Sequence, residues 1–214
     1  MMRVYNLHAL EKLQNVRGVK MRILKRLPLI IGVALLCAIG LGQIWILMHD
    51  FSVVRFLIGL QSFIFGYVLL NRREEDGPSP YPAYIQFAII LSVGLPYLFT
   101  FGNPTPIIGD LISLAGVLLS MWSVISLGRA FGVAPADRGL VAHGPYRFIR
   151  HPMYAGYVIT NLSVLIWNLT LWNLSLYVFI IITFVVRILL EERVVSDYDG
   201  YKEKVRWRII PFIW

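Results

Sequence analysis

The sequence contains a single cysteine, Cys37, and few charged residues. One cysteine excludes an internal disulfide and a cysteine-based metal cluster. Only 15% of the 214 residues are Asp, Glu, Lys or Arg, whereas soluble domains carry about 25%. Because the chain is also 57% hydrophobic, its composition indicates an integral membrane protein.

Several other signatures are absent. No G-x-G-x-x-G follows a strand, which argues against a Rossmann-type nucleotide crevice. The histidines are scattered without metal-ligand spacing, so no metal is expected. No internal repeat is found, which argues against a transporter built from repeats. The formal net charge of +8 does not indicate nucleic acid as a partner, because the basic residues follow the loops.

The hydrophobic residues occur in long blocks. A spanning helix needs about 20 mainly apolar residues, so the first four blocks predict one span each. The last block is too long for one ~30 Å hydrocarbon core, and polar residues at 168–173 interrupt it, so it predicts two antiparallel helices. The fold class is therefore an all-α integral membrane protein with five to six transmembrane helices and a C-terminal helix hairpin. The uncharged blocks are Leu27–Met48, Phe56–Leu70, Tyr81–Asn103, Leu111–Leu127 and Pro152–Val186.

Every second loop is basic, which is the positive-inside pattern and predicts cytoplasmic termini. Residues 1–26 form a basic cytoplasmic segment, either an amphipathic segment attracted to anionic lipid or a solvated arm that only sets topology. Residues 27–127 hold four transmembrane helices. Residues 128–214 hold a polar loop, the hairpin and a C-terminal cytoplasmic cap.

The loop "DRGLVAHGPYRFIRHPMY" carries more polar residues than topology requires. Its glycines mark tight turns, and Pro152 suits the first turn of a helix. His151 is then expected at a helix N-terminus, where unpaired backbone N–H groups favour an anion. The alternative is an ordinary loop whose Arg147 and Arg150 meet lipid headgroups. The tyrosines Tyr146 and Tyr154 around His151 favour a ligand site.

The motif "RILLEE" closes the last hydrophobic helix. Arg187 and Glu191 are four residues apart and share a helix face. Ionisable groups near hydrocarbon are costly and mark a functional site by default, although a simple i,i+4 pair ending the span is the alternative. The tail "YDGYKEKVRWRIIPFIW" is basic and aromatic, which suits an interfacial cap under the bundle.

These three motifs together resemble the isoprenylcysteine carboxyl methyltransferase family, and the wider group of membrane methyltransferases that includes phospholipid N-methyltransferases. The likeness covers roughly residues 127–211 and keeps the order of the motifs. The resemblance implies an S-adenosyl-L-methionine-dependent enzyme with a cofactor pocket facing the cytoplasm. It also implies a lipophilic substrate, prenylated or lipid, that reaches the site from the surrounding membrane lipids.

The resemblance also implies roles for individual residues. Glu191 meets the cofactor's ammonium group and acts with Arg187 in catalysis, while Arg187 orients the substrate carboxylate. The turn at 138–141 holds the adenosine end with its backbone, and the residues around the helix start line the rest of the pocket. The cofactor-binding residues are then Arg138, Gly139, Leu140, Val141, Tyr146, His151, Pro152, Met153, Tyr154 and Glu191.

The acceptor stays open among several classes. The carboxylate of an isoprenylcysteine-like substrate needs no base, because it is ionised at neutral pH. The amine of phosphatidylethanolamine would need one, and a small thiol or isoprenoid acid is a further option. Outside this class, the chain could be a small transporter or assembly factor that uses Arg55 and Asp110. A membrane sterol reductase with a nicotinamide cofactor has a similar architecture.

Overall fold

The computed structural model describes residue 27 and residues 29–46, 48, 53–73, 81, 82, 85, 88, 95–99, 107–133 and 135–214. The described chain is helical, which confirms the predicted all-α class. Its α-helices are Leu29–Ile46, α2 (Val53–Leu70), α4 (Ile107–Leu127), α5 (Pro152–Trp167), α6 (Leu171–Val194) and α7 (Tyr198–Lys204). Short 3-10 helices occur at η1 (Leu95–Leu98), η2 (Gly128–Ala130) and η3 (Gly144–Arg147).

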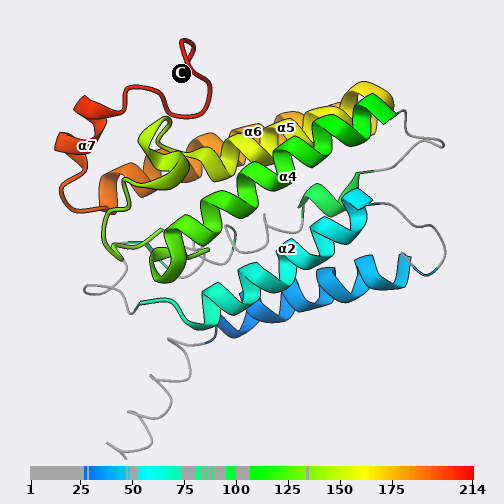
Figure 1. Cartoon of the computed structure of the whole chain (residues 1–214), viewed down its shortest axis with the longest axis horizontal. Helices are drawn as coiled ribbons and strands as arrows, with labels where there is room; N and C mark the ends of the chain where they lie inside the picture. The colour runs from blue at the N-terminus through cyan, green and yellow to red at the C-terminus, as the bar shows by residue number, and fades with distance from the viewer. Residues whose placement is uncertain are drawn as a thin grey trace, which may run out of the picture.

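The long helices lie side by side in one bundle (Figure 1). Helices α4, α5 and α6 form one layer, and α2 with the helix Leu29–Ile46 forms another beneath it. Helix α7 and the C-terminal segment lie together at one end of the bundle, beside the start of α5 and the end of α6. The predicted basic segment 1–26 lies outside the described residues.

The hydrophobic run that begins at Pro152 divides into α5 and α6, as its length and its polar residues predicted. Thr170 is the N-cap of α6, and its hydroxyl accepts from the backbone N–H of Asn173 at 3.1 Å. The Asn173 amide donates to the carbonyl of Asn168 at 2.8 Å. These side chains satisfy backbone groups that the helix ends leave without partners, so the hairpin turns here.

Helices α4 and α5 pack without intervening side chains at one crossing. A Cβ added to Gly156 would lie 2.5 Å from the carbonyl oxygen of Gly116 and 2.8 Å from the backbone nitrogen of Ser120. Close approach of this kind is typical of small residues between membrane helices. Nearby, the Ser163 hydroxyl donates to the Gly109 carbonyl at 2.7 Å. The first residues of α5 are therefore held firmly against α4.

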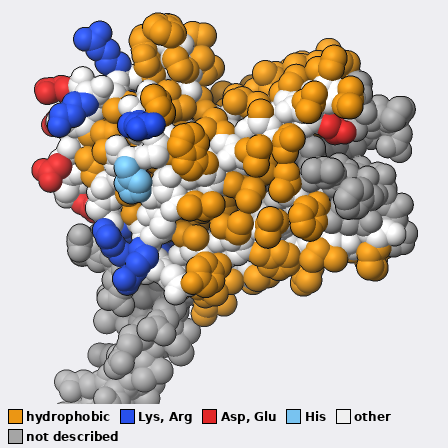
Figure 2. All heavy atoms as spheres, in the orientation of Figure 1, with side chains coloured by type: hydrophobic (Ala, Val, Ile, Leu, Met, Phe, Trp, Pro, Cys, Tyr) orange, Lys and Arg blue, Asp and Glu red, His pale blue; other side chains and the backbone are white. Residues whose placement is uncertain are grey.

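Within the described part of the chain, three helices are long and apolar enough to cross a membrane: Leu29–Ile46, Ile107–Ala130 and Leu171–Val194. These helices account for three of the five to six predicted crossings. The apolar part of α2, Phe56–Leu70, is shorter, α5 has 16 residues, and most of the predicted span 81–103 lies outside the described residues. Figure 2 shows an apolar flank and a gathering of charged side chains at one end, as expected of a protein embedded in lipid.

The charged end contains the predicted cap. Backbone N–H groups of Arg150 and His151 donate to the carbonyls of Trp207 and Arg208, each at 2.8 Å. The Tyr201 hydroxyl of α7 donates to the carbonyl of Tyr146 at 2.6 Å. The C-terminal segment is thus hydrogen-bonded to the loop before α5. The side of the membrane on which this end lies stays a prediction.

Candidate functional site

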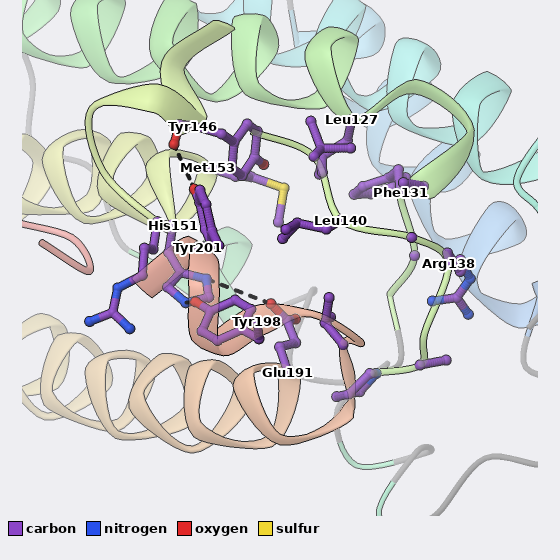
Figure 3. Close-up of a pocket in the computed structure, with 18 of the residues that line it drawn as sticks. Leu127, Phe131, Arg138, Leu140, Tyr146, His151, Met153, Glu191, Tyr198 and Tyr201 are labelled. Carbon is purple, nitrogen blue, oxygen red and sulfur yellow. Dashed lines mark hydrogen bonds and ion pairs between the residues drawn. The ribbon is translucent and has the colours of Figure 1, made fainter. Parts of the chain in front are cut away.

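A pocket opens at the charged end of the bundle, between the loop that precedes α5, the end of α6 and α7 (Figure 3). Its empty volume is about 770 Å³, a figure that includes the open space at its mouth. The lining is mainly apolar, with a few polar groups that converge on one end. Its polar side chains include Arg138, Tyr146, Arg150, His151, Tyr154, Glu191, Tyr198 and Tyr201.

The loop 135–141 forms one wall and is fastened to the end of α6 through Asp137. Its carboxylate accepts from the backbone N–H of Gly139 at 3.0 Å and from the backbone N–H of Ser196 at 2.9 Å. The Ser196 hydroxyl also donates to it. Burial alone would raise the pKa of Asp137, but these hydrogen bonds outweigh it and lower the pKa. Gly139 has a φ of +88°, a conformation in which glycine is favoured.

Arg138 directly follows Asp137, but its side chain turns away from the polar end of the pocket. Its guanidinium is buried against Gly132, where an added Cβ would lie 2.3 Å from Nη1. Figure 3 shows it on the far side from His151 and Glu191. The predicted role of this turn through its backbone is compatible with the arrangement, since the side chain supports the wall instead of crossing the pocket.

His151 is the N-cap residue of α5 and Pro152 its first residue, as predicted from the H-P pair. The His151 side chain makes no capping hydrogen bond. It faces α6 instead, where Nε2 lies 3.1 Å from Oε1 of Glu192 and Nδ1 lies 3.9 Å from Oε2 of Glu191. The imidazole therefore stands between two consecutive carboxylates, with Nδ1 on the side of Glu191.

Glu191 and Arg187 share a face of α6, as their spacing predicted, with Nη2 3.9 Å from Oε1. The Tyr154 hydroxyl donates to the same carboxylate oxygen of Glu191. The Arg187 guanidinium lies 5.3 Å above the Tyr154 ring and donates to the Val133 carbonyl at 3.0 Å. Tyr154 thus links the start of α5 to both ionisable residues of the "RILLEE" motif.

A second, smaller pocket lies deeper in the bundle and is lined mostly by apolar side chains. Phe131 and Met153 line both pockets. Arg187 is the charged residue of this second pocket. Its Nε atom is buried and has no hydrogen-bond partner among the residues that the structure describes, so a donor stands available at the boundary of an apolar space.

Most of the predicted site residues come together. The cofactor-binding candidates all line the first pocket except Pro152, which is buried in the first turn of α5. Arg187, the predicted substrate-binding residue, lines the second pocket instead. Their proposed roles stay predictions, because geometry brings the residues together without testing what they bind.

Sequence reasoning missed the aromatic residues of the cap. Tyr198 and Tyr201 of α7 line the pocket, and burial raises the pKa of each phenol above its usual value. Burial, with a further contribution from the charge of Glu191, also raises the pKa of Tyr146 well above its usual value. These rings therefore stay neutral and offer π faces to a cation. The Y-x-x-Y spacing on a short helix was the available signal.

Among the described residues, no group of His, Cys, Asp and Glu could hold a metal ion. The site instead offers a carboxylate beside an imidazole, several aromatic faces and a backbone turn. Such a set can bind a cationic molecule with a large apolar part.

Comparison with known protein families gives a match over part of the chain. Residues 104–200 match the family model described as phospholipid methyltransferase. That range contains α4, the polar loop, α5, α6 and the beginning of α7. No curated protein and no solved structure matches the chain. The chain is an integral membrane protein, and its residues 104–200, a little under half of its length, are similar to the phospholipid methyltransferase family within the wider group of membrane methyltransferases.

Proposed function

We propose that the protein transfers a methyl group from S-adenosyl-L-methionine to the amine of an aminophospholipid such as phosphatidylethanolamine. The observation that carries this proposal is that two unlike pockets share the lining residues Phe131 and Met153, within the range that matches the phospholipid methyltransferase family. The family match favours the phospholipid amine over the isoprenylcysteine carboxylate, which was the first expectation from the sequence.

The first pocket suits the donor. Methyltransferases of this family use S-adenosyl-L-methionine as methyl donor, a molecule with an ammonium group, a sulfonium centre and an adenosine. The Glu191 carboxylate offers a partner for the ammonium group. The faces of Tyr146, Tyr154 and Tyr201 suit a sulfonium, and the backbone at 138–141 can hold polar groups of the adenosine. The chemistry of the pocket lining therefore suits this donor.

The second pocket suits the lipid. Its walls include Leu36, Phe65, Tyr157 and Phe184, which favour hydrocarbon. Arg187 supplies a buried cation whose Nε lacks a partner among the described residues. A guanidinium is well suited to a phosphodiester. The sequence predicts that Arg187 orients a carboxylate, and a lipid phosphate can accept the same hydrogen bonds from its guanidinium. With the phosphate held there, the lipid amine extends toward the first pocket.

The chemistry that follows is a displacement. The bound donor supplies a methyl carbon attached to a positively charged sulfur, which is an electrophile without further activation. The chain holds the two reactants in line, which supplies much of the rate when the reacting atoms are ~3–3.5 Å apart. Phe131 and Met153 are apolar and belong to both linings, so a reaction site bordered by them would hold little water, which strengthens the contacts of Arg187 and Glu191 with charged groups.

Labelled methyl groups test the proposal directly. Purified protein in vesicles that contain phosphatidylethanolamine is expected to move label from methyl-tritiated S-adenosyl-L-methionine into the chloroform-soluble phospholipid fraction. A parallel reaction with farnesyl-cysteine tests the carboxylate alternative, because the resulting methyl ester releases volatile label in base. Label only in the ester would refute the proposed acceptor, and label in neither product would refute the proposed activity.

Glu191→Gln is expected to weaken the binding of S-adenosylhomocysteine at least ~10-fold, because a charged hydrogen bond to the ligand's ammonium group is lost. Isothermal titration calorimetry in detergent measures this affinity. Glu203→Gln is the matched control, since Glu203 is exposed on α7 and outside the pocket. Equal affinities of the two variants would contradict the assignment of Glu191.

A further inference from the structure

The second glutamate of the E-E pair turns away from the pocket and is surrounded by polar partners. Consecutive residues on a helix project about 100° apart, so Glu192 faces the loop and the C-terminal segment while Glu191 lines the pocket. Arg208 binds both carboxylate oxygens of Glu192, and Arg150 binds one. The contacts of Glu192 are Arg208 Nε at 3.0 Å and Nη2 at 2.9 Å, Arg150 Nη1 at 3.0 Å, Tyr198 Oη at 3.0 Å and His151 Nε2 at 3.1 Å.

These contacts determine which nitrogen of His151 carries the proton. The single hydroxyl proton of Tyr198 goes to Glu192, so the Tyr198 oxygen can only accept from His151, whose Nε2 lies 3.2 Å away. Nε2 therefore faces two acceptors, Glu192 and Tyr198. Only a proton on Nε2 satisfies both contacts, and a neutral imidazole then carries its lone pair on Nδ1.

Nδ1 is the nitrogen on the side of the pocket. It lies 3.9 Å from Oε2 of Glu191, and His151 and Glu191 both line the cavity. Figure 3 shows the two side chains pointing toward one another across its polar end. The other oxygen of Glu191 already accepts from Tyr154. A lone pair and a carboxylate oxygen thus face the same space, which suits a group that carries protons.

We propose that Glu192 is a positioning residue that presents Nδ1 of His151 as the proton acceptor for the protonated amine of the lipid. The inference rests on the proposed function, because a carboxylate acceptor has no proton to lose. The ammonium proton moves to Nδ1, and the freed nitrogen lone pair forms the new N–C bond. The C–S bond breaks with its electron pair left on sulfur, and the imidazolium returns its proton to water at the open mouth of the pocket.

The charges around His151 favour this transfer. Glu191 and Glu192 face the imidazole from α6, Tyr198 faces it from α7, and Arg150 and Arg208 stand beyond Glu192. One carboxylate faces each nitrogen of the ring, Glu192 at Nε2 and Glu191 at Nδ1, and both are placed to stabilise an imidazolium. A base of this kind contributes ~10²–10⁴-fold to a rate.

Glu192→Gln tests the positioning role. The glutamine amide can donate to Nε2, which places the imidazole proton on Nδ1 and turns the lone pair away from the pocket. With phosphatidylethanolamine as acceptor, kcat is expected to fall at least ~10-fold, while the affinity for S-adenosylhomocysteine stays within about twofold. The acidic limb of the kcat–pH profile is expected to move to lower pH, because a negative neighbour of the imidazole is lost.

Two further variants separate the positioning role from a general effect of charge in the cap. Arg206→Gln removes an exposed charge of the C-terminal segment and leaves the contacts of Glu192 in place, so its kcat is expected to stay within about threefold of wild type. His151→Gln is expected to lose the acidic limb altogether, and it keeps the test decisive if Glu192→Gln does not fold. Unchanged kcat and pH profile in Glu192→Gln, or an intact acidic limb in His151→Gln, would overturn the inference while the proposed function stands. Failure of wild type to methylate phosphatidylethanolamine would overturn both.

Discussion

Arg187→Met is expected to reduce methyl transfer at least ~100-fold and to leave the affinity for S-adenosylhomocysteine nearly unchanged. Arg187 lines the deeper, apolar pocket and not the one that contains Glu191. Removal of a buried charge that stabilises a reacting complex costs ~10²–10³-fold in rate. Methionine keeps the length and the apolar contacts of the side chain, so the loss would arise from the guanidinium.

The matched control for this variant is Arg193→Met, on the same helix but exposed. Its turnover is expected to equal that of wild type. Arg187→Lys keeps the charge without the planar fork and is expected to retain part of the activity. Single-turnover rates with bound donor, together with thermal melts in detergent, separate a chemical defect from unfolding. A turnover of Arg187→Met equal to that of wild type would contradict the assignment of Arg187 to the acceptor site.

Gly156→Val is expected to produce the largest loss of stability, with a fall in melting temperature of roughly 2–12 °C. The atoms that meet a new Cβ are backbone atoms of α4, the Gly116 oxygen at 2.5 Å and the Ser120 nitrogen at 2.8 Å. Backbone atoms cannot rotate away, so the helices must separate. Overpacking of this kind costs ~1–3 kcal/mol, and each kcal/mol lowers the melting temperature of a chain this long by about 2–4 °C.

Activity is expected to fall together with stability in Gly156→Val, because the same helix begins with His151 and Tyr154. Gly42→Val is the control, since a Cβ at Gly42 meets nothing within 4 Å. Differential scanning fluorimetry of both variants in detergent measures the difference. Equal melting temperatures would show that α4 and α5 do not depend on the close approach seen at this crossing.

The parts of the fold that the sequence could predict are those with local causes. The uncharged runs predict helices because a helix satisfies all backbone groups within one segment in lipid and needs runs of this length. Asn168 and Thr170 predict the hairpin because polar groups there cap helix ends. The pairing of Arg187 with Glu191 follows from helix periodicity alone. Each of these inferences needs only neighbouring residues.

The parts that could not be predicted depend on contacts between distant segments. Glu191 and Glu192 are adjacent and chemically equal, and only the place of Arg208 and Arg150 shows which of the two faces the pocket. The turn that begins at Arg138 is predicted to hold the donor through its backbone, and the packing of the Arg138 side chain against Gly132 depends on a contact that the motif does not reveal. The assignment of Arg187 to the deeper pocket also depends on Phe131 and Met153, which come from different segments.

Phe131 and Met153 have a kinetic consequence as the shared border of the two cavities. The water-soluble reactant would enter from the aqueous mouth, and the lipophilic reactant would enter from the bilayer. The two reactants would therefore use separate entrances. Neither would obstruct the other, so each product could be exchanged while its companion stays in place. A lipid that needs several successive rounds of alkylation could then remain seated while spent donor is replaced.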